Sequence, residues 1–269
     1  MSLTASDRKT IGLAWPRFRL SEARWLSLIL LLVLWELGSR SGLIPPRILA
    51  APSTVLVTLW SMVVSGELPS NLVVSLARAS AGLAIGMVVG TTLALVSGLS
   101  RLGESTVDPL MQIKRTIPSL ALTPLFIVWF GIGEAPKITL IAVGTTFPIY
   151  LNLFAGIRAV DARLIEAARS FGLKGLDLIV HVILPGALPS FLTGLRYAMG
   201  VALLVLVVAE QINAQAGLGY LINNARDFMR TDVIVVCLLV YASLGLAADQ
   251  AVRVLESRAL AWRPTFLKS

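Results

Sequence analysis

The sequence predicts an all-α integral membrane protein with six transmembrane helices. Of its 269 residues, 56% are hydrophobic and only 14% are charged, whereas soluble domains carry about 25% charged residues. The apolar residues form long runs, and a helix needs about 20 of them to cross a bilayer. The cations stand in short segments between these runs, which is typical of membrane proteins.

Six stretches are assigned as spans. They lie at 24–40, 71–98, 110–131, 137–157, 187–211 and 232–250. The first follows a basic tail, and a signal peptide also has a basic front and an apolar middle. We favour a retained helix because no small-residue cleavage site follows the run directly. The chain then divides into an N-terminal tail (1–23), a membrane domain (24–262) and a C-terminal tail (263–269).

The third stretch is the least regular. Lys114 and Arg115 stand early in it, and Pro118 and Pro124 lie inside it. Proline is tolerated in membrane helices when neighbouring groups satisfy the freed carbonyls. We therefore expect a helix that begins outside the bilayer and bends where it enters.

Two further features concern packing. Between the first two spans, a stretch punctuated by Pro52-Ser53 and Gly66 is too short to cross and predicts an interfacial helix on the outer side. One face of that helix carries Leu56, Leu59, Trp60 and Val63. In the second span, Gly82, Gly86 and Gly90 recur at every fourth position. Small residues at this spacing let another helix approach closely, which predicts tight packing within the bundle.

The charge distribution predicts the orientation. If the N-terminus is inside, six spans return the C-terminus to the same side, and most of the 23 cations then lie inside. This agrees with the positive-inside rule. The net charge of +8 does not indicate nucleic-acid binding, because the cations form no basic face on a soluble fold.

Several kinds of chemistry are absent from the sequence. No lysine follows a glycine as a phosphate-binding loop requires, so the chain lacks the usual ATPase motif. The single histidine, His181, excludes a metal site with several His ligands and argues against a Ser-His-Asp triad. We expect no catalytic residues and no metal, and we interpret Cys237 as a packed hydrophobic residue.

Few ionisable residues lie within the spans. Glu210 ends an apolar run near the predicted outer end of span five, Asp249 closes span six, and Glu36 is placed to pair with Arg40. None lies at a span midplane, so the pattern does not indicate a proton or sodium relay.

A polar segment separates the fourth and fifth spans on the predicted inner side. Asp161 is a good N-cap and Gly172 a good left-handed stop, which predicts a short helix over 161–172. An apolar face of this helix would carry Leu164, Ala168 and Phe171, and a charged face would carry Arg163, Glu166 and Arg169. A second short helical piece is expected from Leu176 to Ile183, ending before Pro185.

The spacing within this segment resembles the signature of permease subunits of ABC importers. Glu166-Ala167-Ala168 is followed after three residues by Gly172, and nine residues later by Val182, one residue and Leu184-Pro185. The family pattern prefers Ile where Val182 stands. Residues 25–262 are similar to the nitrate/sulfonate/taurine branch, and "SGELPSNLVVSLAR" and "VSGLSRLGE" are most similar to aliphatic-sulfonate permeases.

The resemblance implies a type I ABC importer permease fold in a bacterial inner membrane. It implies a partner copy of the permease, two cytoplasmic ATPase subunits that hold the ATP and Mg²⁺, and a periplasmic substrate-binding protein. No cofactor is expected in this chain. The 161–172 segment would be the coupling helix that docks on the ATPase. The residues expected to make or support this coupling are Glu166, Ala167, Ala168, Phe171, Gly172, Leu184 and Pro185.

The substrate path is less defined, and alternatives remain open. Polar candidates for it are Ser75, Arg78, Thr145, Thr146 and Asn213. The leading function is import of aliphatic sulfonates, with taurine, nitrate, bicarbonate or a pyrimidine precursor as alternative substrates. A secondary transporter or channel, and a non-transporting scaffold, are rival classes. We take a homodimer as the default over pairing with a related permease.

Overall fold

The computed structural model describes residues 20–262, and the predicted C-terminal tail and most of the N-terminal tail lie outside this range. Within this range, the secondary structure consists of helices joined by turns and loops. Its helices are α1 (Leu20–Arg40), α2 (Pro52–Val64), α3 (Glu67–Leu99), α4 (Arg101–Thr116), α5 (Thr123–Phe130), α6 (Glu134–Arg158), α7 (Ala162–Ser170), α8 (Gly175–Leu178), α9 (Leu184–Gln211), α10 (Leu218–Asp227) and α11 (Thr231–Ala259). The all-α prediction is therefore confirmed.

Among residues 20–262, four helical segments are long and apolar enough to span a membrane, and a fifth is added if α4 and α5 form one broken span. The four are α3, α6, the run Gly175–Gln211 and α11. α1 covers the first predicted span. However, the uncharged part of α1, between Arg24 and Glu36, is shorter than the thickness of the hydrocarbon layer of a bilayer. The six predicted spans thus compare with four or five by length and composition, so the predicted number is approximate.

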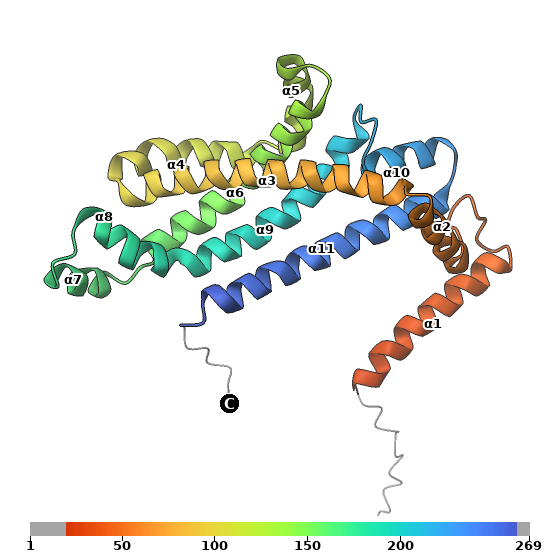
Figure 1. Cartoon of the computed structure of the whole chain (residues 1–269), viewed down its shortest axis with the longest axis horizontal. Coiled ribbons are helices and arrows are strands. Elements are labelled where there is room, and N and C mark those ends of the chain that lie inside the picture. The colour runs from red at the N-terminus through yellow and green to blue at the C-terminus, as the bar shows by residue number, and fades with distance from the viewer. Residues whose placement is uncertain (1–19, 263–269) are drawn as a thin grey trace, which may run out of the picture.

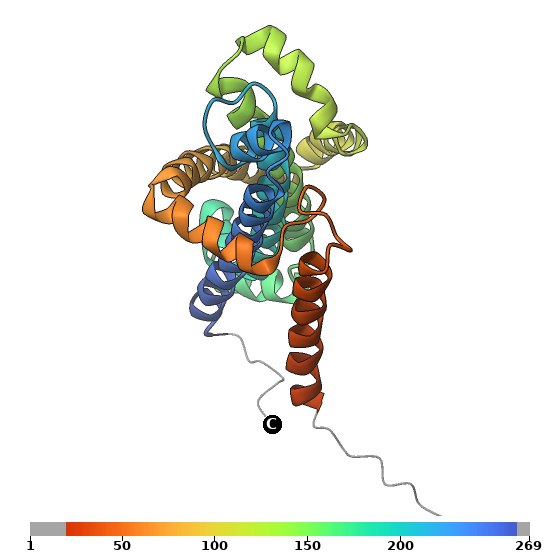
Figure 2. The same cartoon turned by 90° about the vertical axis from the view of Figure 1, so that its right-hand side faces the viewer.

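The bundle is built around α3, α6 and α9, with α11 beside α9 (Figure 1). We call one end of the bundle the α7 end, because α7 and α8 lie there, and the opposite end, with α2 and α10, the α10 end. α1 stands beside the bundle and approaches it mainly through α2 (Figures 1 and 2). Many leucine and isoleucine side chains of α1 are exposed, as expected of a helix that faces lipid.

The predicted glycine stripe packs α3 tightly against α6. Gly82, Gly86 and Gly90 are all buried on this face of α3. A Cβ atom at Gly82 would lie 2.6 Å from the Ile141 side chain, and one at Gly90 would lie 2.7 Å from the Thr146 carbonyl oxygen. The two backbones approach this closely because no side chain separates them, which confirms the prediction of close packing within the bundle.

Replacing Gly86 by valine is expected to separate α3 from α6. A Cβ atom there would lie 2.7 Å from the Ala142 carbonyl oxygen and would also collide with Thr145. Overpacking of this kind costs about 1–3 kcal/mol, so the thermal unfolding temperature of the purified protein should fall. Gly200→Ala is the control, because open space surrounds that glycine. Equal stability of the two variants would contradict this packing.

The third predicted span is a helix broken by about a right angle. α4 and the segment Ser119–Phe130 meet at a bend of 90°. Ile117 between them is extended (φ −86°, ψ 116°) because Pro118 disfavours the helical conformation of the residue before it. The expected bend is present, but the helix begins at Arg101, well before the predicted start of the span at 110.

The prediction that a short helix ends before Pro185 is wrong. α8 passes through a π-turn (Ile179–Ile183) directly into α9, so helix continues from Gly175 to Gln211. The Leu184 N–H bonds to the Ile179 carbonyl oxygen, a five-residue step. Pro185 lacks an N–H, and the wider turn absorbs this loss without ending the helix.

The α10 end is tied together by polar contacts. The predicted pair of Glu36 and Arg40 is present at 2.5 Å, and Glu36 also accepts from Ser53 at the start of α2. Thr58 of α2 donates to Asp232 of α11 at 2.8 Å. α2 lies in the stretch where a short helix was predicted, and the expected apolar face is exposed at Leu56, Trp60 and Val63, with Leu59 partly buried. An exposed apolar face on a helix too short to span suits an interfacial position.

Candidate functional site

α7 is a short helix with hydrogen-bonded caps at both of its ends. The Asp161 carboxylate accepts from the Arg163 N–H at 2.8 Å, as predicted for the N-cap. Gly172 has a left-handed φ of +90°. Its N–H bonds to Arg169, and the Leu173 N–H bonds to Ala168. These two bonds form a Schellman motif, which is the reason a glycine is required there.

Two large apolar side chains of α7 and its cap are exposed within the described chain. Phe171 is 87% exposed and Leu164 is 59% exposed. Ala168, which was expected to share their face, is instead buried against the rest of the chain. Ala167 is exposed beside Glu166, and within residues 20–262 Glu166 makes no ion pair. The helix therefore presents an exposed surface that is partly apolar and that carries the charged side chains of Arg163, Glu166 and Arg169.

Leu184 and Pro185 lie where the helical run from α8 enters α9. Both are half-buried, and the nearby Ala187 is fully buried in the cluster that also holds Tyr150 and Leu153 of α6. They connect the segment of α7 and α8 to the bundle core. Their predicted role in setting the angle into α9 stays a prediction.

The α10 end contains a buried polar cluster centred on Glu210, near the C-terminal end of α9. This carboxylate is almost completely buried. It accepts from Ser75 Oγ at 2.8 Å, from Arg78 Nη1 at 2.7 Å and from the Gly219 N–H at 2.9 Å. Tyr241 of α11 adds a bond at 3.2 Å. A buried charge needs such partners to offset its desolvation, and here they come from α3, α10 and α11.

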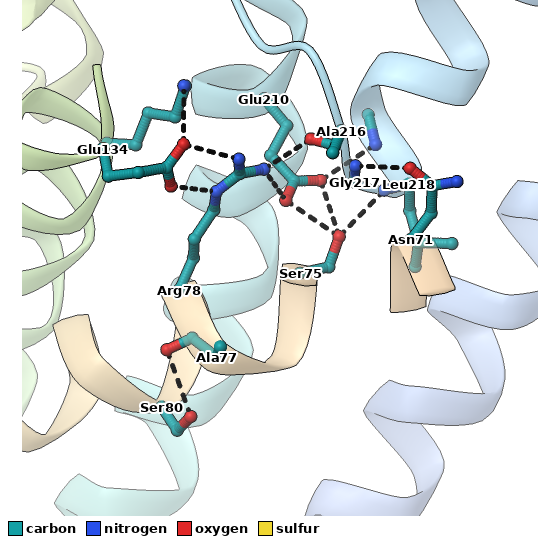
Figure 3. A network of polar contacts seen from close by, with 12 residues as sticks. Asn71, Ser75, Ala77, Arg78, Ser80, Glu134, Glu210, Ala216, Gly217 and Leu218 are labelled. Atoms are coloured by element: carbon teal, nitrogen blue, oxygen red, sulfur yellow. Dashed lines mark hydrogen bonds and ion pairs between the residues drawn. The ribbon is translucent and has the colours of Figure 1, made fainter. Parts of the chain in front are cut away.

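Arg78 lies between two carboxylates, as Figure 3 shows. On one side it contacts Glu210 and the Ala216 carbonyl oxygen through Nη1. On the other side it makes a two-point contact with Glu134 at the start of α6, with Nη2 to Oε1 at 2.7 Å. Lys137 pairs with the same Glu134 oxygen at 3.3 Å. The cluster thus joins α3, α6 and α9 with two cations and two anions.

The predicted path residues lie in different environments. Ser75 and Arg78 belong to the buried cluster. The Thr145 and Thr146 hydroxyls bond to carbonyl oxygens of their own helix, at Ala142 in both cases. Asn213 is exposed, in a left-handed conformation, beside a small pocket. Only Ser75 and Arg78 of this set are brought together among the described residues, and the transport role of all five stays a prediction.

Sequence reasoning missed Glu134, and it did not connect Glu210 to Arg78. The contact between Glu210 and Arg78 had a signal in the sequence, because an arginine and a glutamate in two apolar runs cost free energy unless they pair. Glu134 follows a Gly-Ile-Gly turn, and in the sequence nothing distinguishes it from a glutamate at the protein surface. Its partner Arg78 is 56 positions away along the chain.

Comparisons with known proteins agree with this architecture. The chain is 47% identical over 93% of its length to the putative aliphatic sulfonates transport permease protein SsuC of Escherichia coli, covering 95% of that protein. It is 40% identical to the SsuC of Bacillus subtilis, over 90% of this chain and 89% of that one. The taurine transport system permease protein TauC of Escherichia coli is 34% identical over 92% of both chains.

Solved structures show the same fold. A chain from the crystal structure of an amino acid ABC transporter with histidines superposes with a TM-score of 0.63 at 22% identity, covering 74% of this chain and 98% of that one. A chain of the inward-facing MetNI methionine ABC transporter gives a TM-score of 0.56 at 23% identity, covering 67% and 92%. The family model described as binding-protein-dependent transport system inner membrane component matches residues 82–260. The chain is therefore a member of this family of ABC importer permease subunits.

Proposed function

We propose that the chain is the permease subunit of an ATP-driven importer for aliphatic sulfonates. A binding protein delivers the substrate at the α10 end, which faces the periplasm, and two separate ATPase subunits work at the α7 end in the cytoplasm. Both termini are then cytoplasmic, and the default assembly is a homodimer of the permease. ATP and Mg²⁺ bind to the partner ATPase, and no catalytic residue is assigned to this chain.

The observation that carries the proposal is the surface of α7. A helix with caps at both ends, with Phe171 and Leu164 exposed and with Glu166 free of ion pairs to the described residues, is suited to dock in a groove of another protein. The rigid connection through α8 and the π-turn into α9 would pass a displacement of α7 into the bundle. The substrate class is supported by the relatives SsuC of two bacteria.

Uptake by the reconstituted complex tests this function. Proteoliposomes would contain the permease, its partner ATPase and the binding protein, and labelled ethanesulfonate would be supplied outside. Uptake should require all three proteins and ATP. Uptake by the permease alone under an ion gradient would instead indicate a secondary transporter.

Import of taurine is the second candidate, favoured by the similarity to TauC. Taurine differs from ethanesulfonate by a terminal ammonium group. Competition in the same assay separates the two: excess unlabelled butanesulfonate should block ethanesulfonate uptake, and excess taurine or nitrate should not. The opposite pattern would assign one of those anions as substrate.

Phe171→Ala is expected to weaken binding of the ATPase subunits. Burial of such a side chain contributes about 1.5–3 kcal/mol, so the dissociation constant should rise about ten- to hundredfold. Phe228→Ala is a matched control, because Phe228 is also exposed but lies at the α10 end. The measurement is ATPase binding to the permease in nanodiscs. Equal binding by both variants would exclude Phe171 from the interface.

A further inference from the structure

We propose that Glu134 occupies an anion site on Arg78 and that the sulfonate head group of the substrate displaces it during transport. This inference rests on the proposed function for the identity of the anion. It assigns Arg78 as a substrate-binding residue and Glu134 as its displaceable counter-ion.

The two carboxylates on Arg78 differ in how firmly they are held. Glu210 has no exposed side-chain surface and four further hydrogen bonds, to Ser75 through both oxygens, to Gly219 and to Tyr241. Glu134 is 55% exposed, and its other partner is Lys137. Removing Glu210 from Arg78 would leave several buried donors without a partner, whereas Glu134 can exchange its contacts for water. Glu134 is therefore the carboxylate that can dissociate from Arg78.

The position that Glu134 occupies suits a sulfonate. Arg78 presents Nε and Nη2 to it as a fork, and a guanidinium fork binds carboxylate or other oxyanions through two parallel bonds. Lys137, itself nearly buried, supplies a second cation on the same side. Glu134 stands in the first turn of α6, where the helix N-terminus favours a negative group. Each of these features would act equally on an anion that replaced the carboxylate.

An apolar pocket adjoins this position and could receive the alkyl part of the substrate. Its lining includes Gly133, Pro136 and Lys137 of the same turn and the apolar residues Ile132, Leu140 and Ile212, together with the polar residues Thr123 and Asn213. Its free volume is about 20 Å³, enough for a single water molecule, so the pocket must widen to admit a chain. An aliphatic sulfonate has an anionic head and an apolar tail, and this juxtaposition of cations and apolar side chains matches both parts.

The test measures binding of ethanesulfonate to the permease–ATPase complex in nanodiscs, without binding protein, by calorimetry. If Arg78 is free of Glu134 in about a tenth of wild-type molecules, Glu134→Gln should tighten binding about tenfold. Ethanesulfonamide, an uncharged analogue, should show no such gain. Glu36→Gln is the matched control, because Glu36 also pairs with an arginine at the α10 end but does not touch Arg78.

Equal affinity of wild type and Glu134→Gln for ethanesulfonate would overturn the inference, as would an equal gain in Glu36→Gln. Thermal unfolding of each variant would verify that it is folded, which is expected because Glu134 is half exposed. The same complexes, reconstituted in proteoliposomes and supplied with binding protein, report uptake. If wild-type uptake occurs and the affinities are equal, this inference alone fails, whereas absence of sulfonate uptake means that the proposed function has failed.

Discussion

Replacing Gly172 by valine should lower substrate uptake about five- to thirtyfold while ATP hydrolysis continues. The left-handed conformation of this residue costs about 1–2 kcal/mol when a side chain is added. An energy of this size changes the ratio of two conformational states about five- to thirtyfold. The cost is higher for a β-branched residue, because its side chain is stiff. The Schellman bonds that end α7 would be lost, and the helix could no longer move as one body with the ATPase.

The measurement compares ATP hydrolysis and labelled uptake in the same proteoliposomes. Gly200→Ala is the control, because that glycine has no left-handed φ and no neighbour within 4 Å. The variant should still be inserted in the membrane and purify with the ATPase. Normal uptake by Gly172→Val would exclude a coupling role for this residue.

Glu210→Gln is expected to destabilise the protein more than any other single change at the α10 end. Removing one partner of a buried ion pair costs about 3–5 kcal/mol, because it leaves an uncompensated buried charge. In this chain the remaining charge would be that of Arg78, which is 4% exposed and would keep only the half-exposed Glu134 carboxylate as its ion-pair partner. The first turn of α10 would also be affected, because Gly219 donates its N–H to one of the two carboxylate oxygens and a glutamine has only one acceptor oxygen.

Thermal unfolding in detergent would measure this effect. Glu134→Gln provides a sharp comparison, since it removes the other carboxylate on Arg78 from a half-exposed position. A large fall in unfolding temperature for Glu210→Gln and a small one for Glu134→Gln are expected. Equal falls would show that the two carboxylates contribute equally, against their different burial.

Local features of the sequence were predicted well because their physical causes are local. The lengths of the apolar runs predicted α3, α6 and α11, since the bilayer thickness sets the length of a spanning helix. The caps of α7 depend on Asp161 and Gly172 and on backbone groups within a few positions. The spaced glycines of α3 predicted that another helix packs closely against it, but they did not identify that helix. The end of the helix before Pro185 was misjudged, because a π-turn can absorb a proline.

The sequence by itself thus determined the membrane class, the positions of the main helices, the capped helix at 161–172 and, through its spaced signature, the family. Only the tertiary structure decided that α6 is the partner of the glycine stripe and that Glu210, Arg78 and Glu134 form one cluster. The physical reason is distance along the chain: Arg78 is 132 positions from Glu210 and 56 from Glu134. No local propensity relates such residues, and only the packing of α3 against α6 and α9 brings their charges into contact.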